Sequence, residues 1–181
     1  MEKRITLGDK TFKTYIPYEK LQEAIDAVAA KVNSDYICTE QPPIFVCVLN
    51  GAMMFTSEMM KRVNFDAELI SIKMTSYAGT STTGSVKIPL GLTGDVAGRD
   101  VIVFEDIVDT GVTITALASL LKEKGARSVK TCTMLMKPEV YKQDVPIDYV
   151  GMEIPNKFIV GFGLDYNELG RNQKDIYILD E

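Results

Sequence analysis

The stretch from Val101 to Thr113, with the sequence VIVFEDIVDTGVT, most constrains what this chain can fold into. Apolar residues lead into two adjacent acids, Glu105 and Asp106, and a third acid, Asp109, precedes a Thr-Gly-Val-Thr turn. Such an apolar run predicts a strand that is buried on both faces of a sheet. The stretch therefore predicts a strand, an acidic loop and then a helix, whose apolar residues are Ile114, Leu117, Ala118 and Leu121.

The remainder of the chain alternates between helical and strand patterns. Helices are predicted at Tyr18–Ser34, at Ala52–Val63 and from the central turn to Gly125, and strands at Ile44–Leu49, Ala67–Met74, Val86–Leu92, Val129–Met136, Tyr149–Gly151, Phe158–Gly161 and Ile176–Leu179. Met1–Pro17 has no strong period, and Thr75–Ser85 reads as a loop or a long hairpin tip. This alternation predicts an α/β fold with a mainly parallel sheet, in one domain that spans residues 1–181.

The net charge and the residue types that are absent exclude several kinds of site. The 181 residues have a net charge of −5 and include no histidine. The acidic balance argues against a nucleic-acid partner, and the lack of histidine excludes imidazole bases, His-dependent triads and His–metal sites. Cys38, Cys47 and Cys132 are widely spaced, which is typical of reduced thiols. No apolar run approaches the roughly 18 residues of a membrane span, so a soluble cytoplasmic protein without a membrane partner is expected.

The three acids of the central stretch lie where a ligand site is expected. In open α/β sheets, ligands bind beyond the carboxyl ends of the strands, beside helix N-termini. Glu105-Asp106 is either a charged surface turn or a pair that holds Mg²⁺ or sugar hydroxyls, and its apolar neighbours favour the pair. The turn from Asp109 to Thr113 is either a helix cap or an anion cradle in which Gly111 admits close approach. It lacks the Lys-Ser/Thr that ends a Walker P-loop.

The whole stretch resembles the phosphoribosyl-pyrophosphate signature of the type I phosphoribosyltransferases. Other segments resemble the same family in the same order: LNGAMMF its pyrophosphate loop, TSYAGTSTTG its catalytic lid, and MLMKPE and PNKFIVGFGLDYNELGR the base-recognition and closing segments of its hypoxanthine-guanine branch. These matches extend from about Phe45 to Arg171. The resemblance implies a mainly parallel central sheet flanked by helices, with a small hood built from the terminal segments.

The resemblance also implies which residues bind phosphoribosyl pyrophosphate. Glu105 and Asp106 would bind the ribose hydroxyls with magnesium nearby, and Asp165 would hold a second magnesium. Arg171 would bind pyrophosphate. The other implied contacts come from two loops: Thr110, Gly111, Val112 and Thr113 for the 5′-phosphate, and Leu49, Asn50 and Gly51 for pyrophosphate. The family often has a cis non-proline peptide in the second loop, and Mg²⁺ is the implied cofactor.

The base-side residues rest mainly on the same resemblance. Asp109 would be the acid/base group near N7 of the purine, and Lys137 the donor to its 6-oxo group. Phe158 would stack on the base, and the backbone of Ile159 would read its Watson–Crick edge. Ser76 and Tyr77 would close over the reacting centre. Without the resemblance, Lys137 reads as an ordinary lysine beside apolar surface, Phe158 as a core residue, and Ser76-Tyr77 as part of a loop tip.

The expected activity is purine salvage: transfer of the phosphoribosyl group to N9 of hypoxanthine, and of guanine as well, with release of pyrophosphate. Alternatives within the family act on xanthine, adenine or a pyrimidine, and Lys137 favours a 6-oxo acceptor over adenine. An alternative of another class is a regulatory protein of this fold that binds RNA, which would need a basic face. The resemblance further implies a dimer or tetramer.

Overall fold

A six-stranded sheet forms the centre of the protein, in the order β5-β4-β3-β6-β7-β8. The structure is a computed structural model that describes residues 3–76 and 86–180. The strands are β3 (Ile44–Leu49), β4 (Glu68–Ser76), β5 (Val86–Leu90), β6 (Asp100–Val108), β7 (Ser128–Met136) and β8 (Tyr149–Glu153). All pair in parallel except β5, which runs antiparallel to β4 at the edge. The predicted α/β fold with a mainly parallel sheet is confirmed.

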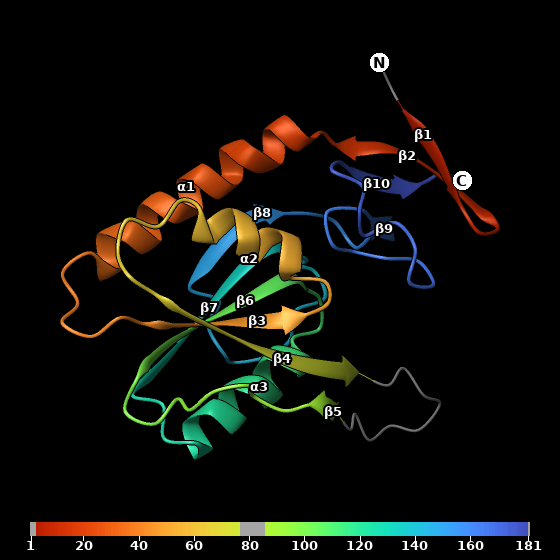
Figure 1. Ribbon diagram of the computed structural model, residues 1–181. Helices are drawn as coiled ribbons and strands as arrows, with labels where there is room; N and C mark the ends of the chain where they lie inside the picture. Colours follow the sequence, from red (N-terminus) through yellow and green to blue (C-terminus); the bar gives the residue numbers. More distant parts are fainter. Residues whose placement is uncertain (1–2, 77–85, 181) are drawn as a thin grey trace.

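Helices cover both faces of this sheet (Figure 1). α1 (Tyr18–Tyr36) and α2 (Met53–Met60) lie on one face, and α3 (Val112–Glu123) lies on the other. Each helix buries an apolar stripe at a spacing of three or four residues. In α1 this stripe includes Leu21, Ile25, Val28 and Val32. Two apolar clusters result, one on each face, and together they fix β3 and β6 at the middle of the fold.

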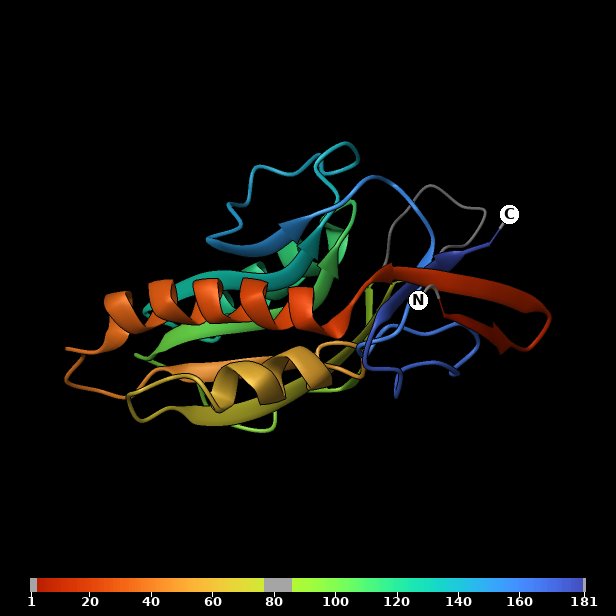
Figure 2. The same ribbon diagram turned by 90° about the horizontal axis from the view of Figure 1, so that it is seen from above.

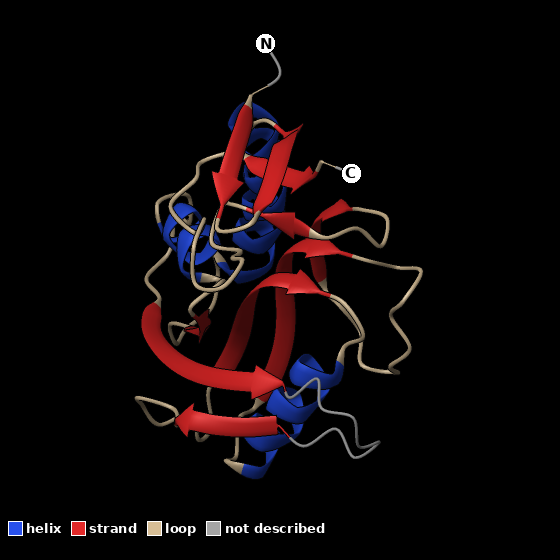
Figure 3. Ribbon diagram, turned by 90° about the vertical axis from the view of Figure 1, so that its right-hand side faces the viewer, coloured by secondary structure: helices blue, strands red, loops and turns tan. Residues whose placement is uncertain are grey.

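A second, four-stranded antiparallel sheet forms the hood. It joins β1 (Arg4–Leu7) and β2 (Lys10–Ile16) to β10 (Ile176–Leu179) and β9 (Ile159–Val160), in the order β1-β2-β10-β9. The hood lies at the end toward which the parallel strands run (Figures 1 and 2). Figure 3 views the molecule from this side. The expected hood of terminal segments is therefore present, and it stands beside the carboxyl ends of the strands.

Two local predictions differ from the structure. Residues 4–16 form a β-hairpin, although Met1–Pro17 shows no strong period, because β2 pairs with β10 far along the chain and so buries Phe12 completely. α2 is shorter than the predicted Ala52–Val63: the chain leaves the helix at Lys61, and Arg62 forms ion pairs with Asp26 and Glu58. Within the described ranges, no helix is long and apolar enough to cross a membrane.

Candidate functional site

The central turn follows β6 and leads directly into α3. Gly111 precedes the helix with φ +82°, a left-handed conformation that glycine adopts without strain. A Cβ added there would also overlap the side chains of Tyr141 and Gln143, which pack against the turn from the segment after β7. The Gln143 amide Nε2 donates to the Thr110 carbonyl oxygen at 3.3 Å. The turn is therefore supported from outside, and its inner side remains open.

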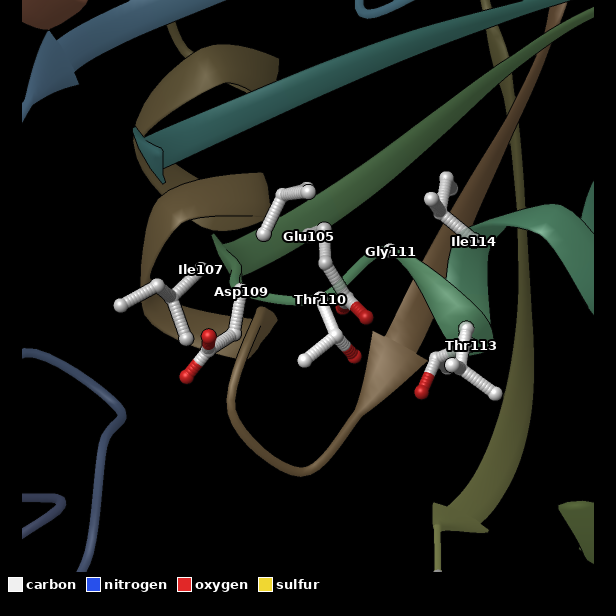
Figure 4. A pocket seen from close by; sticks show the side chains of 9 residues that line it. Glu105, Ile107, Asp109, Thr110, Gly111, Thr113 and Ile114 are labelled. Carbon is white, nitrogen blue, oxygen red and sulfur yellow. The ribbon is translucent and has the colours of Figure 1, made fainter. Parts of the chain in front are cut away.

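That inner side faces a cavity of about 220 Å³, which we call the turn cavity. Figure 4 shows the Glu105 carboxylate and the Thr110 and Thr113 hydroxyls around it, with Asp109 at the start of the turn and Ile107 near the end of β6. Side chains along a strand alternate between faces, so Glu105, Ile107 and Asp109 lie on the same side of this stretch. The lining is completed by Val108, Gly111, Val112 and Ile114.

A larger cavity of about 370 Å³ lies beside the first, and we call it the acidic cavity. Three segments meet at its floor. Gly51, just after β3, lies so close to Asp106 that an added Cβ would overlap the Asp106 carboxylate. Gly163, from the C-terminal segment, approaches the Gly51 carbonyl as closely. The peptide bond between Leu49 and Asn50 is cis, as the family resemblance suggests. The lining residues are Val48, Leu49, Asn50, Gly51, Lys73, Met74, Glu105, Asp106, Thr113, Asp165, Glu168 and Arg171.

Burial sets the electrostatics of the two adjacent acids. It raises the pKa of Glu105 well above the usual range, and the neighbouring Asp106 carboxylate raises it further. Burial also raises the pKa of Asp106 to about 6, against the N–H of Ile107 and the charge of Arg171, which lower it. The Ile107 N–H donates to Asp106 Oδ1 at 2.7 Å. The pair is thus held where ionisation is unfavourable without a positive partner.

Arg171 supplies positive charge at the opposite wall of the acidic cavity. Its Nη2 lies 2.7 Å from Asp165 Oδ1 and 3.0 Å from Glu168 Oε2, and its Nη1 donates to the Gly163 carbonyl at 2.9 Å. The buried Nε of Arg171 has no hydrogen-bond partner within the described residues. An unpaired buried donor is costly, which favours an anionic ligand here. Lys73, within β4, adds a second cation to the lining.

Lys137 follows β7 and is 8% exposed. Its Nζ lies 3.1 Å from Asp109 Oδ2 and donates to Asn156 Oδ1 at 3.2 Å. Asp109, which lines the turn cavity, and Lys137 are therefore brought together as an ion pair. Asn156, which was not predicted, lies in the connection from β8 to β9.

Phe158 and Ile159 lie away from the two cavities. Phe158 is 46% exposed, and its ring centroid lies 6.1 Å from that of Phe12 and 5.9 Å from that of Tyr166 in the hood. It borders a separate cavity of about 220 Å³ that includes Lys13 and Lys157. Ile159 is buried in β9. The predicted stacking platform is thus part of the hood.

The two residues predicted to close over the reacting centre lie where the first described range ends. Ser76 ends β4, and Tyr77 lies outside the described residues. Sequence reasoning did not predict the apolar lining residues Val48, Met74, Ile107, Val108 and Ile114, the charged lining residues Lys73 and Glu168, or Asn156. Ile107 was readable from its position between Glu105 and Asp109, which places it on their side of the strand. Lys73 lies in β4, where it pairs with Leu49 of the neighbouring β3, but strand order is not visible in the sequence.

The carboxylates of the acidic cavity could hold Mg²⁺ only if a bound substrate supplied further oxygen ligands. Across residues 3–76 and 86–180, no three His, Cys, Asp or Glu side chains converge into a metal-binding group. Asp106 and Asp165 nevertheless line the same cavity with Glu105. Mg²⁺ characteristically takes one or two carboxylates and completes its coordination with water and substrate phosphates. Carboxylate oxygens in a cavity that also contains arginine match that pattern.

Comparisons with known proteins agree with this geometry. The phosphoribosyl transferase domain family matches residues 17–167. The hypoxanthine-guanine phosphoribosyltransferase of Streptococcus pneumoniae strain R6 is 37% identical over 93% of each chain. A bifunctional protein TilS/HprT of Listeria monocytogenes strain F2365 is 41% identical over 92% of this chain, which spans only 26% of that relative's length. The crystal structure of a Staphylococcus aureus hypoxanthine phosphoribosyltransferase superposes with a TM-score of 0.86 at 34% identity, covering 92% of this chain and 90% of that one. This chain belongs to the phosphoribosyl transferase family.

Proposed function

We propose that this protein transfers the phosphoribosyl group of phosphoribosyl pyrophosphate to N9 of hypoxanthine, and also of guanine, with release of pyrophosphate. The observation that supports this acceptor is the buried Lys137 ammonium, 3.1 Å from Asp109 at the rim of the turn cavity. A 6-oxopurine offers an acceptor oxygen and a nearby ring nitrogen that carries a proton. A lysine donor and a carboxylate side by side match these two groups.

The turn cavity suits the 5′-phosphate. Gly111 stands at the N-terminus of α3, where backbone N–H groups and the helix dipole favour an anion. Thr110 and Thr113 add hydroxyl donors, and Val112 contributes its backbone. The same cavity reaches Glu105, so a ribose attached to this phosphate lies between the turn and the acids.

The acidic cavity suits the sugar hydroxyls and the pyrophosphate. Arg171 and Lys73 offer positive charge to the leaving group, and the backbone of Leu49, Asn50 and Gly51 lines the same wall. Glu105, Asp106 and Asp165 would hold Mg²⁺ together with substrate oxygens. When bound, Mg²⁺ neutralises charge on the departing oxygens.

The reaction follows from these placements. As the bond between C1′ and the pyrophosphate oxygen breaks, its electron pair leaves with pyrophosphate and positive charge develops on the ribose. The neighbouring carboxylates of Glu105 and Asp106 stabilise that charge, and Arg171 stabilises the leaving group. N9 donates its electron pair to C1′, while Asp109 accepts the proton that the purine must lose at N7. In this proposal Phe158 stacks on the base, the Ile159 backbone reads its Watson–Crick edge, and Ser76 and Tyr77 close over the reacting centre and exclude water.

We further propose that the protein is a homo-oligomer of the cytoplasm. We infer a homodimer or homotetramer, since the large apolar side chains of Leu69 in β4 and Leu90 in the edge strand β5 are 51% and 42% exposed. The thiols of Cys38, Cys47 and Cys132 are free, which suits the reducing cytoplasm. Residues 1–181 would act as one domain, because both ends of the chain build the hood.

The acceptor is tested by an assay with hypoxanthine, guanine, xanthine and adenine, each with phosphoribosyl pyrophosphate and Mg²⁺. Hypoxanthine and guanine should be consumed, adenine should react at least about 100-fold more slowly, and EDTA should abolish turnover until Mg²⁺ is restored. A preference for xanthine or adenine would reassign the acceptor, and full activity in EDTA would remove the metal roles of Glu105, Asp106 and Asp165.

Asp109→Asn should lower kcat for hypoxanthine by about 10²- to 10⁴-fold, because an amide cannot accept the purine proton. The KM for phosphoribosyl pyrophosphate should change little, since Asp109 is placed on the base side. Steady-state kinetics measures both constants, and Asp144→Asn, at an exposed position in the segment after β7, is the matched control. Equal losses in kcat and in affinity for phosphoribosyl pyrophosphate would contradict the acid/base role.

Asp106→Asn should stabilise the free protein while lowering its activity. The folded-state pKa of Asp106 is about 6 and its ordinary value is 3.8, so the folded protein binds more protons between these pH values. Its free energy of unfolding therefore falls as pH rises from 3.8 to 6, by about 1–3 kcal/mol. Asn avoids this loss and can still accept the Ile107 N–H.

Urea unfolding measures this difference. At pH 7.5 Asp106→Asn should be about 1–3 kcal/mol more stable than the unmodified protein, and at pH 3.5 the two should be alike. The exposed Asp66→Asn is the control and should show neither effect. A less stable Asp106→Asn protein at pH 7.5 would show that this carboxylate is satisfied in the free state.

A further inference from the structure

The connection between β8 and β9 brings one polar side chain to the base side of the site. Asn156 is an exposed residue in this connection, yet its side-chain Oδ1 accepts a hydrogen bond from Lys137 Nζ at 3.2 Å. We propose that Asn156 is a positioning residue that holds the Lys137 ammonium on the 6-oxo group of the acceptor base. This inference rests on the proposed function, because the acceptor base is the group that Lys137 is aimed at.

The geometry around Lys137 shows why a second partner is needed. A lysine ammonium is a point charge with three donors on a flexible four-carbon stem, so its position depends on its hydrogen-bond partners. Two partners hold it among the described residues: Asp109 Oδ2 at 3.1 Å and Asn156 Oδ1 at 3.2 Å. Asp109 is the group assigned to the proton of the base, so its bond to Lys137 must change during the reaction. The hydrogen bond from Lys137 to Asn156 is then the one that persists through the reaction.

Asn156 also links the sheet to the hood. Just before it, the Ile154 N–H donates to the carbonyl of Met136, the residue preceding Lys137, at 2.8 Å. Two residues after it, the carbonyl of Phe158 accepts the Leu179 N–H of β10 at 3.2 Å. Figure 2 shows the connection passing from β8 at the sheet to the hood. The short segment is thus tied at one end to the strand that leads to Lys137 and at the other end to the hood.

The experiment is a double-mutant cycle between Asn156 and Lys137. Asn156→Ala removes the acceptor oxygen, Asn156→Asp keeps it, and Lys137→Met keeps the buried stem without the ammonium. The control is Glu153→Ala, at an exposed position at the end of β8. Dissociation constants are measured calorimetrically for inosine 5′-phosphate and for adenosine 5′-phosphate, which lacks the 6-oxo group. KM values for hypoxanthine and phosphoribosyl pyrophosphate are measured in the same variants.

Asn156→Ala should weaken inosine 5′-phosphate binding and raise the hypoxanthine KM about tenfold, the scale of one hydrogen bond to a charged group. It should leave the adenosine 5′-phosphate affinity and the KM for phosphoribosyl pyrophosphate within about twofold. Asn156→Asp should restore inosine 5′-phosphate affinity to within about threefold. In the Lys137→Met background, Asn156→Ala should add less than about a twofold loss, because residues that act through one another are non-additive.

Three results would overturn the proposal: no loss with Asn156→Ala, an equal loss for both nucleotides, or the same loss in both backgrounds. A merely structural role predicts the second and third, together with a lowered Tm. If the unmodified chain fails to convert hypoxanthine, the proposed function itself fails and this inference falls with it. If the chain is active and Asn156→Ala behaves like Glu153→Ala, only the positioning role is removed.

Discussion

A buried carboxylate, Glu105, and a half-buried one, Asp106, stand side by side at the end of the central strand, and the arrangement of the site depends on how their desolvation is tolerated. Glu105 is 8% exposed, and burial raises the pKa values of both Glu105 and Asp106. The Ile107 N–H and the charge of Arg171 only partly offset this for Asp106. A ligand that brings positive charge or hydroxyl donors would stabilise the ionised forms of these two carboxyl groups. Ionised Glu105 and Asp106 therefore lower the stability of the free protein, and a ligand that neutralises them gains binding free energy.

Close backbone packing makes this arrangement specific. Gly51 lies against the Asp106 carboxylate, and Gly163 lies against the Gly51 carbonyl, at separations that no other residue type permits. Loops from three distant parts of the sequence therefore meet at one point. Asp106 lines the acidic cavity and Asp109 the turn cavity, while Glu105 lines both and so joins the two. In the proposed function, the acidic cavity takes the leaving group and Asp109 the acceptor base.

The sequence predicts the features that depend on local pattern. The apolar run before Glu105 predicts a buried strand, Gly111 predicts the turn, and the periodicity of Tyr18–Ser34 predicts a helix that runs to Tyr36. Features that depend on pairing across the chain were not readable. Phe12 is buried only because β2 pairs with β10, and Lys73 reaches the acidic cavity only because β4 lies beside β3. Asn156 looks like an ordinary loop residue until the fold brings it to Lys137.

The central claim is that the Asp109–Lys137 ion pair of the free protein gives way to a 6-oxopurine. A crystal structure of the complex with inosine 5′-phosphate tests this most directly. Lys137 Nζ should then lie within about 3.2 Å of the purine O6 and should keep its bond to Asn156, while its 3.1 Å contact with Asp109 Oδ2 lengthens and Asp109 turns toward N7. An unchanged Asp109–Lys137 pair, with the purine bound elsewhere, would contradict the account.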